Sequence, residues 1–190
     1  MSFFINNNLN NFKEKNTWWG VLIMTIILAL CTWIAVTRDW FPVFDYVNLI
    51  FHEAGHWIWA IFGETMKFLG GSLNQVLIPI ICLIVLVIKR KWLGAMFSLW
   101  WTGQSLVNLS VYIGDAWAKA LPLLGGDNVV HDWNWLLGMW GLRDYDTQIA
   151  STVWWIGTAL MVGAVIWGLI LFFILLRFKK QKVVDSKGNS

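Results

Sequence analysis

The chain has 190 residues, of which 58 % are hydrophobic and only 13 % are charged. A soluble domain is nearer half apolar and about a quarter charged, and one small soluble core cannot hide this much apolar surface. The formal net charge of +3 does not indicate a nucleic-acid partner, because the basic residues cluster at the ends of apolar runs. The two clusters, Lys89 to Lys91 and Arg177 to Lys182, lie where cytoplasmic anchors of membrane helices are found. The composition therefore predicts an integral membrane protein.

Residues 1–16 are polar and rich in asparagine, and we expect them to form an N-terminal tail. Five long apolar segments follow, and a helix needs roughly 20 residues to cross the hydrocarbon core. They are residues 17–37, 41–63, 73–88, 92–114 and 149–176. The first is longer than the apolar region of a signal peptide and has no small-residue cleavage site, so we expect an uncleaved helix. The third is short and contains Pro79, which leaves open a re-entrant segment in place of a span.

The fourth and fifth segments are separated by a more polar loop, residues 115–148. Three tryptophans in this loop, Trp133, Trp135 and Trp140, predict a short amphipathic helix at the membrane interface. We expect one membrane-embedded domain over residues 17–176 and a basic tail over residues 177–190. The predicted fold is an all-α polytopic bundle of about five transmembrane helices. With five spans, the distribution of Lys and Arg favours an N-terminus outside the cell and a C-terminus in the cytoplasm.

The second apolar segment contains an H-E-x-x-H motif, formed by His52, Glu53 and His56. On a helix, residues i and i+4 lie one turn apart on one face, so two imidazoles at this spacing can bind one zinc ion. The glutamate between them lies beside the water on the metal and can accept its proton. A charged residue in an apolar segment costs about 2.5–3.5 kcal/mol, so three ionisable groups together indicate a shared task. The motif predicts a zinc site with Glu53 as general base, against the alternative of a polar patch that joins helices.

Two polar stripes bear on the third zinc ligand, since catalytic zinc usually has three protein ligands. They are Asp45, Asn48, His52 and His56, and Gln104, Asn108, Tyr112 and Asp115. Each stripe follows one helix face, and two polar faces in a membrane should meet each other or a water-filled cavity. Asp115 is therefore the first choice for the third ligand, with Asp127, His131 and Asp132 as alternatives. Asp115 is offset in depth from His56 by about 12 Å, which helix tilt, a kink or a returning loop would have to close.

The H-E-A-G-H run at residues 52–56, inside a membrane segment, resembles the site-2-protease-type intramembrane zinc metalloproteases, in particular their small bacterial members. Two weaker matches are Gly-Gly-Ser at residues 70–72, where such proteins often have a glycine-rich turn, and Asn108 followed by Asp115. The latter pair looks like a degenerate form of the family's downstream Asn…Asp motif, without its proline-containing core. The resemblance covers roughly residues 45–116. It implies zinc, Glu53 as general base and Asp115 as the remaining ligand.

These features predict a zinc metallopeptidase of the bacterial cytoplasmic (inner) membrane that cleaves a transmembrane or juxtamembrane segment of a protein substrate. Glu53 would take a proton from water, and Asn108 or His131 would stabilise the oxyanion. Two alternatives stay open, a zinc hydrolase acting on a lipid amide or ester, and a non-catalytic membrane scaffold or metal-binding protein. A membrane di-iron oxygenase needs many more histidines than the three present. Other divalent metals can replace zinc at such sites.

Overall fold

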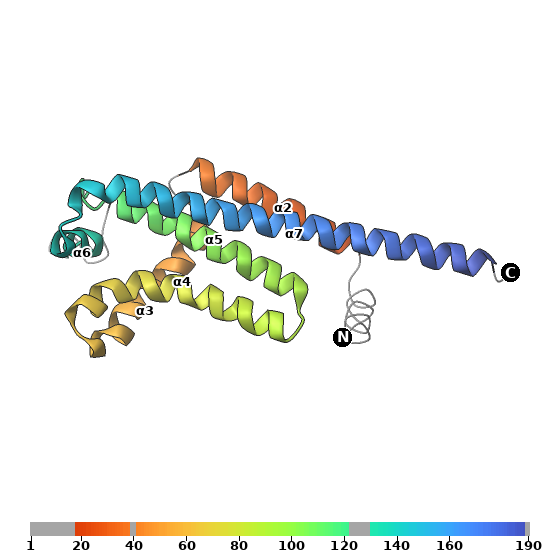
Figure 1. Ribbon diagram of the computed structural model, residues 1–190, viewed down its shortest axis with the longest axis horizontal. Helices are drawn as coiled ribbons and strands as arrows, with labels where there is room; N and C mark the ends of the chain where they lie inside the picture. The colour runs from red at the N-terminus through yellow and green to blue at the C-terminus, as the bar shows by residue number, and fades with distance from the viewer. Residues whose placement is uncertain (1–17, 39–40, 122–129, 189–190) are drawn as a thin grey trace.

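The computed structural model describes residues 18–38, 41–121 and 130–188, and the regular structure in these ranges is all helical. The α-helices are α2 (Trp18–Thr37), α3 (Pro42–Trp59), α4 (Glu64–Ile88), α5 (Trp92–Gly114), α6 (Asp132–Trp140) and α7 (Asp146–Gly188), and the short 3-10 helices are η1 (Ala60–Phe62) and η3 (Arg143–Tyr145). Figure 1 shows that α7 runs along the whole bundle and continues beyond it. The predicted tail at residues 1–16 and the candidate ligand Asp127 lie outside the described residues.

Three helices in the described ranges are long and apolar enough to cross a membrane, namely α2, α4 and the stretch Arg143–Lys179 that includes most of α7. Their outer surfaces expose large apolar side chains, such as Trp33 at 69 % and Ile88 at 74 %. Soluble proteins rarely expose apolar surface on this scale. The chain is therefore a helical membrane protein. The expected count of five spans is not reached by this measure, because α3 and α5 each give one face to polar residues.

The third apolar segment is one continuous helix, not a short re-entrant one. It begins at Glu64, nine residues before the predicted start, and passes Pro79 without a break over 25 residues. Membrane helices tolerate an internal proline because neighbouring groups satisfy the backbone that it frees. The sequence prediction placed the start too late because the first part of α4 is polar and glycine-rich.

Two helices, α2 and α5, both run antiparallel to α7. As α2 proceeds from Val21 to Thr25, its partners on α7 move back from Leu171 to Gly168. Along α5 the partners on α7 are Met96 with Gly168, Gly103 with Gly157, and Gly114 with Ala150. Glycines at the α5–α7 crossing let the two backbones approach closely, as is common in membrane bundles. Consequently α2 and α5 are parallel to each other.

Helix α3 also runs parallel to α5, and antiparallel to α4. The pairs between α3 and α5 are Asp45 with Gln104 and His52 with Tyr112, and those between α3 and α4 are His52 with Gln75 and His56 with Lys67. The consecutive helices α2 and α3 therefore point the same way, whereas alternating spans would oppose them. Trp18, the first residue of α2, packs against Phe172 and Lys179 of α7. The expected placement of the two chain ends on opposite sides of the bundle does not match these contacts.

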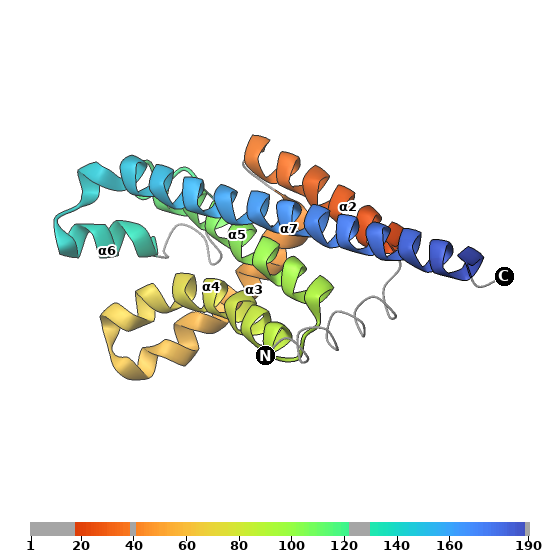
Figure 2. The same cartoon turned by 45° about the vertical axis from the view of Figure 1, so that its right-hand side comes forward.

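One end of the bundle gathers the elements that matter for the site. The turn between α3 and α4, the end of α5, and α6 all lie there, away from the C-terminus (Figure 2). Gly63, with φ of 103°, reverses the chain between α3 and α4, and Gly141, with φ of 69°, ends α6 in the left-handed conformation that favours glycine. The predicted short helix in the 115–148 loop is confirmed as α6.

Candidate metal centre

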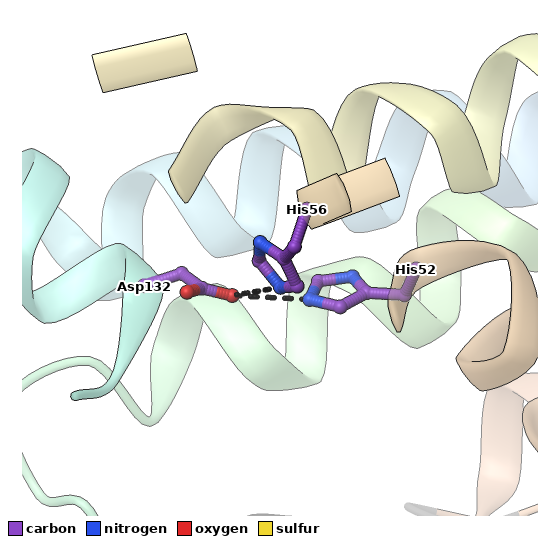
Figure 3. Close-up of side chains that lie close together, drawn as sticks. All are labelled: His52, His56 and Asp132. Atoms are coloured by element: carbon purple, nitrogen blue, oxygen red, sulfur yellow. Dashed lines mark hydrogen bonds and ion pairs between the residues drawn. The ribbon is translucent and has the colours of Figure 1, made fainter. Parts of the chain in front are cut away.

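The two histidines of the motif point to the same place from one face of α3, and the carboxylate of Asp132 meets them there (Figure 3). Oδ2 of Asp132 lies 3.0 Å from Nε2 of His52 and 3.3 Å from Nε2 of His56. Ligand atoms of all three residues lie within 4.8 Å of one another, and this is the one such group among the residues that the structure describes. His52 and Asp132 are buried, so water competes little for them.

The donor set fits a divalent transition metal such as zinc. Zinc binds imidazole nitrogen and carboxylate oxygen at roughly 2.0–2.2 Å in a tetrahedral arrangement, which puts two of its ligand atoms about 3.4 Å apart. The two nitrogen–oxygen distances of 3.0 and 3.3 Å are close to that separation. Two imidazoles and one carboxylate make three ligands, the number that leaves a fourth position open in catalytic zinc sites.

Hydrogen bonds on the far side of each ring fix which nitrogen faces the centre. Nδ1 of His56 lies 2.7 Å from the carbonyl oxygen of Lys67, which can only accept, so Nδ1 carries the proton. Nδ1 of His52 lies 3.2 Å from Oε1 of Gln75. The amide nitrogen of Gln75 donates to the carbonyl of Ser105 and to Asn108, which sets the orientation of that amide. Both Nε2 atoms therefore face Asp132, and a metal bound there would take their lone pairs in place of the protons that they share with the carboxylate.

Helix α4 leaves room for the two rings at Gly71. A Cβ added to Gly71 would lie 2.6 Å from Nε2 of His52 and 2.8 Å from Cε1 of His56. Contacts this short do not occur in folded proteins, so any larger residue here would displace the ligand atoms themselves. Glycine at position 71 is thus a requirement of the centre.

We expect Gly71→Ala to weaken zinc binding by at least the roughly 10–100-fold that loss of ligand support costs elsewhere. The measurement is zinc affinity of the purified protein by competition with a chromophoric chelator. Gly163→Ala is the matched control, because a Cβ there meets nothing within 4 Å. Equal affinities in the two variants would show that the rings are not held against α4 as described.

The third member of the group is supplied by a separate helix. Asp132 is the first residue of α6, which packs on α4 through a hydrogen bond from Trp133 Nε1 to Ser72 Oγ, 3.0 Å, and through stacking of Trp135 on Phe68. Burial raises the pKa of the Asp132 carboxyl group. The hydrogen bonds from His52 and His56 lower this pKa by more, so it lies below its ordinary value. Asp132 is therefore an anion at neutral pH, the form in which a carboxylate binds a metal.

The first choice for third ligand, Asp115, lies elsewhere. It ends α5, where its carboxylate accepts hydrogen bonds from the backbone of Ala120 and Leu121, at 2.8 and 3.0 Å. Its Oδ2 lies 3.5 Å from Nε2 of His131. The depth offset between Asp115 and His56 is thus not closed by the helices, and the returning chain closes it with Asp132, one of the alternatives.

His131, the other alternative, caps α6 and does not join the group. Its Nδ1 accepts from the backbone N–H of Asn134 at 3.3 Å, and its ring stacks on Tyr112 with centroids 4.2 Å apart. Burial lowers the pKa of His131 against the attraction of Asp115 and Asp132, so the ring is neutral at pH 7. Its buried Nε2 has no hydrogen-bond partner among the described residues.

The two polar stripes meet, as predicted, and their side chains form hydrogen bonds between α3 and α5. Gln104 of α5 donates to Asp45 and accepts from Asn48, both at 2.7 Å. Asn48 in turn accepts from the hydroxyl of Ser105 at 2.9 Å. Asn108, expected at the oxyanion, is engaged with Gln75 at 2.8 Å. These bonds satisfy the buried polar groups, which would otherwise be costly in a membrane.

Glu53 lies between the two histidines in sequence and is half-buried. Its carboxylate interacts electrostatically with His56 and with Tyr112. Glu53 is next to His52 in the chain and is not a member of the His52–His56–Asp132 group. A role as proton acceptor therefore does not conflict with metal binding by that group.

Sequence reasoning missed the supporting role of Gln75 and mistook that of residues 70–72. The Gly-Gly-Ser run is not a turn but lies inside α4, where Gly70 meets Gly55 and Trp59 of α3, and Gly71 faces the histidines. The spacing could have indicated that Gln75 faces the histidines together with Gly71, because residues 71 and 75 are one helical turn apart and so share a face.

No protein-family model, no curated protein and no solved structure matches this chain. The fold and the site thus define its class on their own. It is a helical membrane protein with a group of two histidines and one aspartate, of which His52 and Asp132 are buried and His56 is half-buried, that could hold a metal ion.

Proposed function

We propose that this protein is a zinc metallopeptidase of the site-2-protease type, with His52, His56 and Asp132 as metal ligands and Glu53 as general base. One observation carries the proposal. An H-E-x-x-H helix presents the Nε2 atoms of two histidines to a carboxylate that is delivered by a separate helix. A merely structural polar patch has no need for a glycine that clears space around both rings, or for ring tautomers set in this way.

The chemistry follows from the placement of the residues. Zinc, when bound, polarises a carbonyl and lowers the pKa of its water to roughly 7. Glu53 would accept a proton from the attacking water and pass it to the leaving amine. The Asp132 carboxylate, charged at neutral pH, balances part of the charge of the cation and completes three protein ligands.

The position of the centre favours a juxtamembrane bond as substrate. His56 lies three residues before the end of α3 at Trp59, and Tyr112 two residues before the end of α5 at Gly114. With a rise of about 1.5 Å per residue, the centre is within roughly one helical turn of these helix ends. A peptide segment that has just left the membrane reaches this depth without unwinding inside the bilayer.

The charges give the proposed orientation. The end of the bundle away from the centre has basic residues between α4 and α5 and late in α7, namely Lys89, Arg90, Lys91, Arg177, Lys179, Lys180, Lys182 and Lys187, and Lys13 and Lys15 precede α2 in the sequence. The end with the centre has Lys67, Lys119 and Arg143, and Arg38 follows the last residue of α2. By the positive-inside rule, both chain ends face the cytoplasm of a bacterial inner membrane, and the centre faces the opposite side.

This orientation predicts that Lys119→Cys reacts with a membrane-impermeant maleimide in intact cells, whereas Lys91→Cys reacts only after the cells are permeabilised. Both lysines are exposed in turns at opposite ends of the bundle, and each variant is compared with the unmodified chain, which has Cys31 and Cys82. Labelling in the reverse order would invert the orientation.

The proposed activity is tested by expressing the protein in bacteria and mapping new peptide termini in the membrane fraction by mass spectrometry. Termini that depend on wild-type protein, and that vanish with Glu53→Gln, support the proposal. Lipid extracts of the same membranes are examined in parallel. Hydrolysed lipid amides or esters without new peptide termini would replace the peptidase by a lipid hydrolase.

A further inference from the structure

Tyr112 contacts three residues of the site from the last turn of α5. Its hydroxyl lies 3.3 Å from Oδ2 of Asp132 and 3.2 Å from the backbone nitrogen of the same residue. Its ring stacks on His131 with centroids 4.2 Å apart and meets His52 edge-on at 5.6 Å. Among the described residues, Tyr112 is the one whose side chain bonds to both the backbone and the carboxylate of Asp132.

The need for such a contact follows from helix geometry. The first N–H groups of an α-helix have no partner within the helix, and Asp132 is the first residue of α6. The hydroxyl of Tyr112 accepts this free N–H and, with its own hydrogen, donates to Oδ2 of the side chain. One hydroxyl therefore fixes both the start of α6 and the oxygen that faces His52 and His56.

The other bonds between α6 and the bundle lie further along the helix. Trp133 is bonded to Ser72 and Trp135 stacks on Phe68, and both hold the helix as a body without touching the carboxylate. The side chain of Asp132 could still rotate about its own bonds. Besides the two histidines, the Tyr112 hydroxyl is the side-chain group in the described ranges that bonds to the ligand oxygen itself.

We propose that Tyr112 is the positioning residue of the third metal ligand, and that its hydroxyl holds Oδ2 of Asp132 ready for the metal. The inference rests on the proposed metal centre. Tyr112 acts through Asp132, so its effect on metal binding exists only while that carboxylate is present. This dependence separates a positioning role from a general role in packing.

The test is a cycle of four proteins: wild type, Tyr112→Phe, Asp132→Ala and the double variant. Phenylalanine keeps the ring on His131 and removes only the hydroxyl. Zinc affinity, measured by chelator competition, should fall about 10–100-fold in Y112F and show no further loss when Y112F is added to D132A. The visible absorption of Co²⁺-loaded protein should change in Y112F. Tyr145→Phe, in the exposed turn η3, is the matched control and should behave as wild type.

Two results would overturn the inference. One is wild-type zinc affinity in Y112F, and the other is an equal loss in the presence and absence of Asp132, which would make the hydroxyl structural only. If Y112F does not fold, the wild-type sequence is labelled with ¹⁹F-tyrosine and its ¹⁹F NMR spectrum tests the inference instead. The Tyr112 resonance, assigned by elimination with Tyr46→Phe and Tyr145→Phe, should shift on zinc addition, and an unmoved resonance would reject the inference. Failure of wild type to bind zinc would instead reject the metal centre itself.

Discussion

Replacing Glu53 with glutamine is expected to lower peptide-bond hydrolysis by about 10²–10⁴-fold, the usual contribution of a general base, while zinc stays bound. Glutamine has nearly the same size and cannot accept the proton. The three metal-ligand residues do not include Glu53, so the substitution leaves them untouched. The measurement combines zinc content of the purified protein with the rate at which peptide termini accumulate in proteoliposomes that contain bacterial membrane proteins.

The matched control for this variant is Glu64→Gln, because Glu64 is an exposed residue at the start of α4 and lies outside the candidate centre. It should retain both zinc and the wild-type rate. Full turnover in Glu53→Gln would remove the general base from the mechanism. Loss of zinc in Glu53→Gln, with Glu64→Gln unaffected, would make Glu53 a support of the centre and leave its catalytic role without evidence.

The sequence was sufficient for those parts of the site that depend on one helix. His52 and His56 are related by helical periodicity alone, so their common face could be read directly. The same holds for the meeting of the two polar stripes, because buried amides and carboxylates in lipid have no other partners. The hydrogen bonds from Gln104 to Asp45 and from Asn48 to Gln104 bear this out.

The third ligand could not be chosen in this way, because it depends on where a connecting segment returns. Asp115 lies on the polar face of α5 but ends that helix, and its carboxylate accepts hydrogen bonds from the backbone of the segment that follows. Asp132 follows a stretch without helical periodicity, so no spacing links it to His52. The sequence could rank the acidic residues of the loop only as alternatives to Asp115.

The direction of the helices was also beyond the sequence pattern. Alternating spans are the simplest assumption for apolar segments separated by short turns, and they would make α2 and α3 antiparallel. The contacts of Val21 and Thr25 with α7, and of Asp45 with α5, make α2 and α3 parallel. The start of α2 then lies at the end of the bundle that carries the C-terminal basic cluster, as the contacts of Trp18 with Phe172 and Lys179 show.

Asp132→Ala is expected to lower zinc affinity by more than the roughly 100-fold upper range for loss of a supporting group, because a ligand itself is removed. Asp115→Ala should leave zinc affinity unchanged and cost about 1.5–3 kcal/mol of stability, the range for hydrogen bonds to a charged group. The reason is that Asp115 holds the backbone of Ala120 and Leu121. Zinc content by elemental analysis and thermal unfolding of the metal-free protein separate the two effects.

Each aspartate serves as the control for the other, since both are buried carboxylates that contact a histidine. The pair also decides between the structure, which favours Asp132, and the polar stripes and family resemblance, which both favoured Asp115. Zinc lost from Asp115→Ala but kept by Asp132→Ala would mean that the chain rearranges around the metal and that α6 leaves the centre. Zinc lost from Asp132→Ala alone would mean that a helix outside the H-E-x-x-H region completes the centre, so any partner or substrate that displaces α6 would also release the metal.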